Sequence, residues 1–495
     1  MSKVAVIGAG VGGLGAAIRL AKLGLDVTVF EANDNVGGKI NNLALGTYRF
    51  DMGPSVFTGP EYIEQLYDLC GEDFSTFEYK KLPQSFHYFF QDGTKLILPA
   101  EIEGIAQEFK EKLGENPDII KKYLQKSKGN YEHIAPLFIE SSLHRIKHLI
   151  NNKLLSALLR IPKYRLNSTM HQENSKTFKN PKTTQIFDRY ATYNGSDPYQ
   201  TPAMLNMIQH LEMNVGVFLP KNGMVQIAHS LRDLALKQGV TFKFNEKVSE
   251  IHLENQKVKG IRTSKGDYSF DYVFSNMDVS HTYEKLMPNA KRPEKTLAQE
   301  KSSSAMVFYW GIKDTFEQLG VHNMFFSEDY KAEFDAIFKS KTLTKDPSIY
   351  VHITCKELKD DAPEGKENWF TMINVPINNG QDWDTLRKEA KATILKKLSS
   401  ILGKDIAPLI EEEFVMDPVF IEEKYSGKAG SIYGNSSNNK FAAFYRHPNF
   451  SKTIEGLYFV GVTVHPGGGI PLALNSAKIA VSCLEEDFGE DLITD

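Results

Sequence analysis

The stretch VAVIGAGVGGLGAAIRLAKLGLDVTVFEA, residues 4–32, decides the fold class because it predicts a dinucleotide-binding unit almost at the first residue. Residues 4–7 are a short apolar run that is typical of a buried parallel strand. The motif G-x-G-x-x-G follows at Gly8, Gly10 and Gly13. Such glycines permit a tight turn, the approach of the backbone to a diphosphate, and close packing of a helix on a strand.

The residues after the glycines complete a strand–helix–strand unit. Helical spacing continues over residues 13–23, and residues 27–30 form a second predicted strand that ends at Glu31. The N-terminus of the helix favours a phosphate, and a carboxylate at Glu31 can accept a hydrogen bond from a ribose hydroxyl. The same carboxylate argues against NADP because it would repel the 2′-phosphate. We therefore expect a dinucleotide, and at this point both NAD and FAD are possible.

A second glycine-rich helix start near the other end of the sequence favours FAD. The stretch EGLYFVGVTVHPGGGIPLALNSAKIAVSCL, residues 455–484, predicts a strand over 457–460, a glycine loop over 467–469 and a helix from about Pro471. Backbone N–H groups at this helix start could stabilise negative charge at the N1/O2 edge of a reduced flavin. The alternative is an independent strand–helix unit without such a role.

Two turns after the first unit are further candidate parts of a flavin site. Gly37-Gly38-Lys39 could turn past the flavin diphosphate, with Lys39 adding a positive charge. Residues 51–55, DMGPS, form another predicted turn with exposed backbone amides. Both segments could also be ordinary surface turns.

The middle of the sequence completes the predicted cofactor domain. Residues 219–278 predict a helix followed by strands with a hairpin, in which Val248 would pass the adenine. The expected FAD-binding domain is therefore discontinuous and takes residues 1–85, 215–290 and 450–495. The expected substrate-binding domain takes residues 86–214 and 291–449. The predicted fold class is α/β, with a Rossmann-type FAD-binding domain beside a substrate domain of mixed sheet and helices.

The bulk composition narrows the possible partners and the compartment. The chain has 495 residues, of which 41% are apolar and 24% charged, so two or more globular domains are expected. The formal net charge of −4 argues against broad nucleic-acid binding. Three widely separated cysteines, Cys70, Cys355 and Cys483, predict neither a disulfide framework nor a zinc site. With no signal peptide and no apolar run of about 18 residues, we expect a cytoplasmic protein.

Seven stretches spread along the sequence form a set that resembles one known family. They are Gly8–Gly13, Glu31, Gly37–Lys39, DMGPS at 51–55, FLPKNGM at 218–224, SNMD at 275–278 and VGVTVHPGGGIPLALNSAK at 460–478. Together they resemble the phytoene-desaturase type of carotenoid desaturase, within the FAD-dependent amine-oxidase (glutathione-reductase-like) superfamily. The resemblance covers nearly the whole chain and is closest to the 1-hydroxycarotenoid 3,4-desaturases of marine flavobacteria. Departures at Met277 and Val462-Thr463 could affect the cavity beside the flavin ring.

This resemblance implies an activity, a cofactor and a set of binding residues. The implied reaction is hydride transfer from an acyclic or hydroxylated carotenoid to flavin N5, which introduces a C=C bond, with oxygen or a quinone as the final electron acceptor. The residues expected to bind FAD are Gly8, Gly10, Gly12, Gly13, Glu31, Ala32, Gly38, Lys39, Gly53, Pro54, Ser55, Val248, Asn276, Gly461, Gly469, Ile470 and Leu472. No metal site is expected. No catalytic residue is assigned either: Asp188, Asp197 and His465 could each accept a proton, but such residues are more often structural.

Three segments outside the cofactor domain suggest how a substrate is bound. Residues 141–166, SSLHRIKHLINNKLLSALLRIPKYRL, predict a basic amphipathic helix, which is either a membrane-surface helix or a core helix with a solvated basic face. The carotenoid resemblance favours peripheral membrane contact through a helical part at about 100–170. Residues 187–207, FDRYATYNGSDPYQTPAMLNM, resemble a tunnel-lining stretch whose aromatic faces suit a flat polyene, although a plain loop is equally possible. Apolar runs between 306 and 380 predict strands, and the resemblance to the superfamily implies that they form a sheet that floors the substrate cavity.

Other functions stay possible on the sequence alone. Another carotenoid or phytoene desaturase would share all of these motifs. A carotenoid isomerase would need reduced flavin without net oxidation. An FAD amine oxidase would need an aromatic cage and a water-accessible site, and a non-catalytic flavoprotein would only bind a membrane or a lipid.

Overall fold

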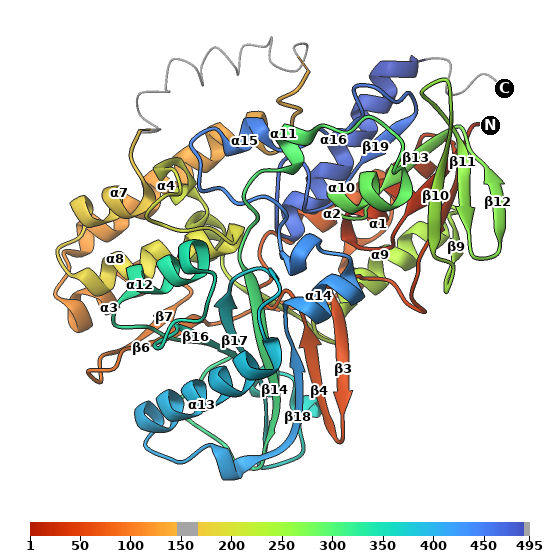
Figure 1. Ribbon diagram of the computed structural model, residues 1–495. Coiled ribbons are helices and arrows are strands. Elements are labelled where there is room, and N and C mark those ends of the chain that lie inside the picture. Colours follow the sequence, from red (N-terminus) through yellow and green to blue (C-terminus); the bar gives the residue numbers. More distant parts are fainter. Residues whose placement is uncertain (146–166, 490–495) are drawn as a thin grey trace.

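A parallel sheet built from distant parts of the chain forms one half of the molecule (Figure 1). The computed structural model describes residues 1–145 and 167–489. The five strands have the order β19-β13-β1-β2-β9, and all neighbours are parallel. They are β1 (Lys3–Ile7), β2 (Asp26–Phe30), β9 (Thr241–Lys243), β13 (Tyr272–Ser275) and β19 (Leu457–Phe459). The beginning, the middle and the end of the chain therefore share one sheet.

Helices and a small antiparallel sheet cover this parallel sheet. The helix α1 (Val11–Lys22) packs against α9 (Val225–Lys237) and α16 (Ile470–Phe488). The three-stranded sheet contains β10 (Val248–Glu254), β11 (Lys257–Thr263) and β12 (Gly266–Ser269). The strands and helices that the sequence predicts around residues 4–32, 219–278 and 455–484 are confirmed, with ends that differ by one or two residues.

A seven-stranded sheet forms the centre of the other half, and its order is β18-β14-β17-β16-β15-β6-β7. Its neighbours are antiparallel except for the parallel pair β15 and β6. The strands are β6 (Gln84–Phe89), β7 (Lys95–Pro99), β14 (Ser304–Ile312), β15 (His322–Phe325), β16 (Ile349–His352), β17 (Glu367–Val375) and β18 (Ile410–Met416). The strands predicted between 306 and 380 are thus present.

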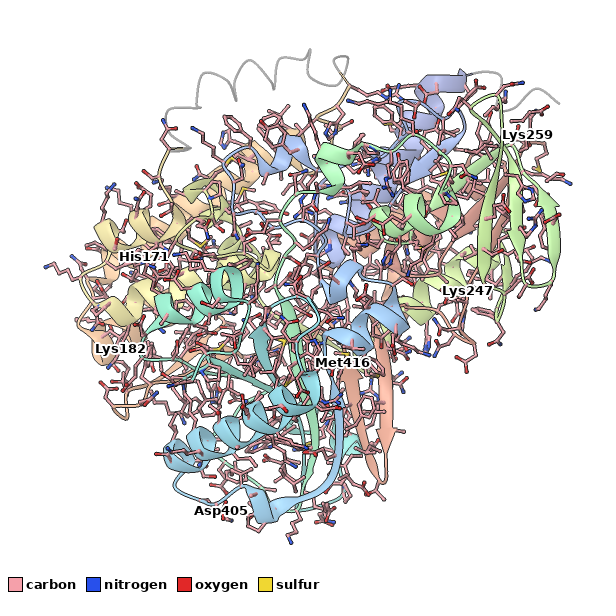
Figure 2. The ribbon with its side chains drawn as sticks, viewed as in Figure 1. His171, Lys182, Lys247, Lys259, Asp405 and Met416 are labelled. Atoms are coloured by element: carbon pink, nitrogen blue, oxygen red, sulfur yellow. The ribbon has the colours of Figure 1, made fainter. Side chains whose placement is uncertain are left out.

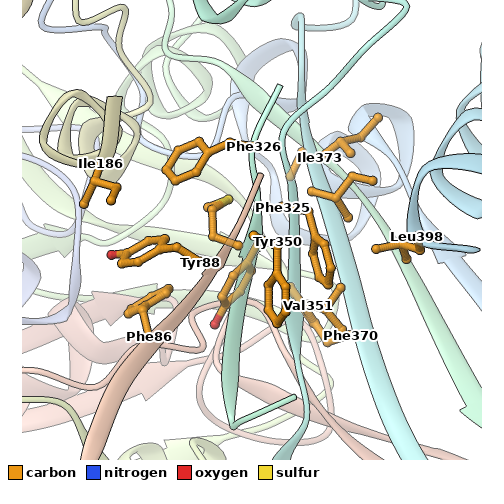
Figure 3. Close-up of a cluster of buried hydrophobic side chains, with 14 of the residues drawn as sticks. Phe86, Tyr88, Ile186, Phe325, Phe326, Tyr350, Val351, Phe370, Ile373 and Leu398 are labelled. Carbon is orange, nitrogen blue, oxygen red and sulfur yellow. The ribbon is translucent and has the colours of Figure 1, made fainter. Parts of the chain in front are cut away.

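Helices on both faces explain why the central strands of this sheet are largely buried along their whole length. All nine residues of β14 are buried, as expected for a strand covered on both sides. Figure 3 shows aromatic side chains of the sheet between Ile186 of α8 (Pro181–Asp188) and Leu398 of α13 (Trp383–Leu402). Aromatic residues contribute much buried area here, which stabilises this half.

The remaining elements connect and flank the two large sheets. Two strand pairs are β3 (Asn41–Leu45) with β4 (Tyr48–Met52), and β5 (Tyr79–Lys81) with β8 (Phe218–Pro220). The other helices include α2 (Glu61–Cys70), α3 (Ile102–Leu113), α4 (Pro117–Phe138), α7 (Met170–Thr177), α10 (Val279–His281), α11 (Glu294–Leu297), α12 (Tyr330–Asp335), α14 (Pro418–Tyr425) and α15 (Ala442–Tyr445). Among the residues that the structure describes, none of the helices combines the length and apolarity needed to cross a bilayer.

The predicted basic helix does not begin where its pattern indicates. The helix α4 ends at Phe138, and residues 141–145 form turns and bends. Residues 146–166 lie outside the described residues. Arg145 instead forms an ion pair with Asp487 of α16 at 2.7 Å, and its guanidinium lies 4.4 Å from the centre of the Phe450 ring. The charge of Arg145 therefore contacts α16 of the protein itself.

A buried ion pair joins the helical segments to the seven-stranded sheet. Arg189 Nη2 donates to Glu212 Oε1 at 2.7 Å and to the hydroxyl oxygen of Tyr88 at 2.9 Å. Tyr190 donates its hydroxyl proton to the same carboxylate at 2.6 Å. The Arg189 guanidinium also lies 4.2 Å from the centre of the Phe86 ring. Both charges are shielded from water, so each needs the other.

Replacing Glu212 with alanine should destabilise the protein strongly. The change leaves the buried Arg189 charge without its partner, and we expect the free energy of unfolding to fall by about 3–5 kcal/mol. Urea unfolding followed by intrinsic fluorescence measures this loss.

The matched control is Lys257→Ala, which breaks an ion pair with Glu455 whose two side chains are each about half exposed. That exposed pair should contribute no more than about 1 kcal/mol. Equal, small losses in the two variants would contradict the role given to the buried pair.

Candidate functional site

A cavity of about 540 Å³ extends from the parallel sheet to the seven-stranded sheet. This volume is in the range of small-molecule binding sites. Lys247, just before β10, and Met416, at the end of β18, both line the cavity although they lie in different parts of the molecule (Figure 2). The cavity therefore connects the predicted dinucleotide site to the half that was predicted to bind a substrate.

The glycines after β1 form one end of the cavity and allow two very close backbone contacts. A Cβ atom on Gly13 would lie 2.1 Å from the carbonyl oxygen of Gly8, so only glycine lets α1 start this close to β1. A Cβ on Gly12 would lie 2.8 Å from the backbone nitrogen of Gly461. The N-cap residue Gly10 provides no side-chain cap, so the first N–H groups of α1 are available to a phosphate.

Glu31 is positioned to bind a ribose hydroxyl. Its carboxylate is buried, lines the cavity, and accepts hydrogen bonds from the backbone N–H groups of Ala9 at 2.8 Å and Asn33 at 2.9 Å. The side-chain amide of Asn33 donates a third bond at 2.8 Å. Because a carboxylate has about four acceptor positions, one is left for a ligand hydroxyl. The residues present at this end thus fit the adenosine part of FAD.

The cavity gathers the predicted cofactor residues from all three segments. Every residue of the predicted FAD set lines it except Gly13, whose role is the packing of α1 on β1. Lys39 also lines it, and its ammonium donates a hydrogen bond to the carbonyl oxygen of Ile432 at 2.5 Å. Burial lowers the pKa of Lys39 to about 8. Met277, Val462 and Thr463, where the chain departs from the family pattern, lie in the same wall.

The expected turn at residues 51–55 is partly wrong. Asp51 and Met52 are the last residues of β4, and the turn starts only at Gly53, which has a φ angle of 103°. Asp51 is buried and accepts hydrogen bonds from Arg49 Nη2 at 2.7 Å and from the backbone N–H of Met224 at 2.9 Å. Pairing of β4 with β3 fixes this strand, and only residues 53–55 reach the cavity.

The start of α16 forms a second N–H-rich wall. Its N-cap residue Gly469 has no side-chain cap, and a Cβ atom added there would meet no heavy atom within 4 Å. A Cβ on Gly468, by contrast, would lie 2.3 Å from the ring of Tyr433. The loop is thus packed on one side and open to the cavity on the other. Such a helix start can stabilise negative charge on a ligand.

The other end of the cavity is apolar and rich in methionine. Residues of the seven-stranded sheet that line it include Ala305, Val307, Met324, Phe370, Met372 and Met416. The opposite wall comes from the predicted tunnel stretch and the residues after it, with Thr192, Tyr193, Met204, Leu205, Met207, Ile208 and Leu211. Methionine side chains adapt their shape, and aromatic faces give a flat ligand a defined orientation. This end suits a long apolar molecule.

None of the three residues considered as proton acceptors lines the cavity. Asp188 is hydrogen-bonded to His171 at 2.6 Å, and burial raises its pKa. Asp197 caps a turn through the backbone N–H of Tyr199 at 2.8 Å. His465 is buried beside the carbonyl oxygen of Ser141 at 2.9 Å, and burial lowers its pKa to about 3. All three have structural partners.

Several polar residues of the cavity were missed by the sequence reasoning. Tyr350 lines the wall, with its hydroxyl 2.9 Å from Ser55 Oγ and 2.7 Å from His322 Nδ1. Arg189 and Arg446 line it as buried cations. Arg189 lies in the stretch 187–207 that the sequence indicates as tunnel-lining. No local motif marks Tyr350 or Arg446, because isolated arginine and tyrosine side chains acquire their meaning from distant partners.

Comparison with known proteins agrees with this geometry. Residues 11–484 match the family described as flavin containing amine oxidoreductase. The chain is 50% identical to a 1-hydroxycarotenoid 3,4-desaturase of Flavobacterium sp. (strain P99-3), over 98% of this chain and 99% of that protein. It is 31% identical to a 4,4'-diapolycopene oxygenase of Methylomonas sp, over 96% of this chain and 97% of the relative. The resemblance to carotenoid desaturases is thereby confirmed.

Solved structures confirm the fold alone, because their sequences are distant. An oxidoreductase from Methanosarcina mazei aligns with a TM-score of 0.58 at 17% identity, over 98% of this chain and 100% of that chain. A putrescine oxidase bound to putrescine aligns with a TM-score of 0.61 at 13% identity, over 98% of each chain. With the glycine cluster, Glu31 and the start of α16 around one cavity, the chain belongs to the flavin containing amine oxidoreductase family, and its cofactor is FAD.

Proposed function

We propose that this protein is a carotenoid desaturase that introduces a C=C bond into an acyclic or hydroxylated carotenoid. The proposed reaction is the 3,4-desaturation of a 1-hydroxycarotenoid. The observation that carries this proposal is the continuous cavity from the FAD end to the apolar, methionine-rich wall. The 50% identity to a relative named for this reaction supports the choice of substrate.

The proposed assignment of the cofactor follows the two helix starts. The diphosphate lies at the start of α1, near Gly10 and Gly12, and Glu31 binds the adenosine ribose. The flavin ring lies toward Gly461 and the start of α16, where the cavity widens into its apolar end. Under this assignment, residues 1–85, 215–290 and 450–495 act as the FAD-binding domain, and residues 86–214 and 291–449 act as the substrate-binding domain.

The protein's own groups have mainly orienting roles in this reaction. Bound FAD supplies an acceptor for the hydride that leaves an allylic carbon of the polyene. Phe370 and the methionines of the wall hold the flat chain and exclude water. Conjugation spreads the positive charge that develops on the substrate, so no strong catalytic side chain is needed for hydride loss.

The apolar lining favours a lipid over the alternative substrates. An amine substrate would need a polar or aromatic cage for its ammonium group. Beside the rings of Phe370 and Tyr350, the sheet wall contains Val307, Met324, Met372 and Met416, which offer no polar group to an ammonium. An isomerase or a lipid carrier would have the same wall, and only the reaction itself distinguishes them.

The proposed reaction can be followed by absorption. Purified holoenzyme is mixed with liposomes that contain a 1-hydroxycarotenoid with a single bond at C3–C4, and we expect a shift of the absorption maximum to longer wavelength because conjugation lengthens. The same carotenoid with a double bond already at C3–C4 is the control and should not change. Altered band shape without longer conjugation would indicate isomerisation, and an unchanged spectrum would contradict the proposed substrate.

Glu31→Ala should weaken FAD binding. A hydrogen bond to a charged group contributes about 1.5–3 kcal/mol to the binding free energy, so its loss should raise the Kd for FAD roughly 10–100-fold. Titration of apoprotein with FAD measures this change. Glu31→Gln keeps the size of the side chain and should give a smaller loss.

Glu455→Ala is the matched control, because it removes an exposed carboxylate that pairs only with Lys257 on the surface. It should bind FAD as the unchanged protein does. Normal FAD affinity in Glu31→Ala would contradict the placement of the adenosine.

We also propose that the protein binds a membrane surface beside the mouth of the cavity. Phe441, Phe444 and Tyr445 are 46%, 48% and 51% exposed, although large apolar side chains are usually covered. Their neighbours Lys440 and Ala442 line the cavity. A lipid surface would cover these rings and deliver an apolar substrate directly. The cytoplasmic location and an oxygen or quinone acceptor stay predictions.

Replacing both Phe441 and Phe444 with serine should reduce binding to lipid vesicles. Co-sedimentation with vesicles at fixed ionic strength measures the bound fraction, and we expect a clear decrease because two exposed rings no longer enter the lipid. The control is Leu236→Ser on α9, which removes an exposed apolar side chain of 51% exposure from another surface. Equal binding of both variants would contradict the proposed surface.

A further inference from the structure

Arg446 is a buried cation without an anionic partner. The residue is 4% exposed, and its guanidinium donates only to backbone carbonyls, to Tyr433 at 3.3 Å and to Asn435 at 2.8 Å. No carboxylate among the described residues influences it, and burial lowers its pKa to about 10. Arg446 is therefore still charged at neutral pH. A buried charge without a counter-ion is costly, so the fold retains it at the expense of stability.

The position of Arg446 connects it to the start of α16. Its side chain lines the cavity, and a Cβ atom on Gly467 would lie 3.3 Å from its guanidinium carbon. Gly467 begins the glycine loop that leads into the uncapped N-terminus of α16. The guanidinium and the first N–H groups of α16 thus present positive charge to the same part of the cavity. The corresponding wall at α1 is separate and belongs to the diphosphate.

Other cations near this loop already have partners. Lys39 is bonded to the carbonyl oxygen of Ile432 at 2.5 Å, and its charge is favoured by Asp278. Lys301 donates to Asn435 Oδ1 at 2.8 Å and also lies near Asp278. Arg446 differs because no acid among the described residues compensates its charge. A bound anionic group would supply this counter-charge.

The chemistry of the flavin supplies such a counter-charge on reduction. A hydride brings two electrons and one proton to N5, so the N1/O2 edge of the ring gains a negative charge while the second substrate proton leaves to solvent or a base. We propose that Arg446, together with the start of α16, stabilises this negative charge and thereby raises the two-electron reduction potential of the bound FAD. A stronger oxidant is suited to removing hydride from a hydrocarbon. The proposal concerns the cofactor and does not depend on the identity of the substrate.

The test compares charge removal with charge retention in the holoenzyme. Arg446→Met removes the charge, and Arg446→Lys keeps it. The two-electron potential is measured by equilibration with reference dyes, and the dissociation constant for sulfite is measured by flavin absorption, because sulfite adds to N5 and leaves the same negative charge. Neither measurement requires turnover. Lys452→Gln is the control, since it removes an exposed cation that does not line the cavity.

In Arg446→Met we expect the affinity for reduced FAD, relative to the affinity for oxidised FAD, to fall about tenfold. This change corresponds to a reduction potential about 30 mV lower for a two-electron couple. Sulfite affinity should fall by a similar factor. Arg446→Lys should lie between Arg446→Met and the unchanged protein, and Lys452→Gln should match the unchanged protein.

Several outcomes would overturn the proposal. An unchanged potential and sulfite affinity in Arg446→Met would show that Arg446 only holds the backbone of residues 433–435. Weaker binding of oxidised FAD without a change in potential would place Arg446 beside the diphosphate. Loss of FAD from both Arg446→Met and Arg446→Lys would show that Arg446 is needed to bind FAD. That result would also contradict a role in setting the reduction potential of the flavin.

Discussion

The contact between the start of α1 and the segment after β19 holds the site together. A side chain as small as a methyl group on Gly12 would collide with the backbone of Gly461, and one on Gly13 would collide with the carbonyl of Gly8. These absent side chains let two helix N-termini from opposite ends of the sequence face one cavity. The N–H groups and the dipoles of both helices then favour a negatively charged ligand. Without this close approach the starts of α1 and α16 would separate.

The two buried arginines that line the cavity differ in whether a carboxylate balances their charge. Arg189 has its own carboxylate in Glu212, so this pair is electrically complete and fixes the helical segments on the large sheet. Among the described residues, Arg446 donates to the backbone carbonyl oxygens of Tyr433 and Asn435, and we infer that its charge acts on a bound group. A buried charge that is left unpaired lowers stability, and proteins retain such charges at functional positions. The apolar wall between these regions keeps the dielectric low, which strengthens any interaction with the cofactor.

The wall itself combines a rigid and an adaptable surface. The central strands β14 and β17 are largely buried and fix the positions of Val307 and Phe370. The methionines beside them can change shape with little cost, so the same wall accommodates a long chain in a defined plane. The exposed rings of Phe441 and Phe444 lie next to Ala442, which lines the cavity. An exposed apolar surface and the cavity wall are therefore adjacent in the chain.

The amino-acid sequence by itself determined the local units: the strand, glycine turn and helix that begin at Lys3, the acid at Glu31 and the glycine loop before α16. These features depend on contacts within about thirty residues, and steric rules fix them locally. Tertiary structure alone showed that residues 141–145 form turns and bends and that Arg145 pairs with Asp487. It also decided that Asp51 ends a strand, and that Arg189 is neutralised while Arg446 is not. Each of these outcomes depends on partners far away in the chain, and no local pattern records the distance between such residues in space.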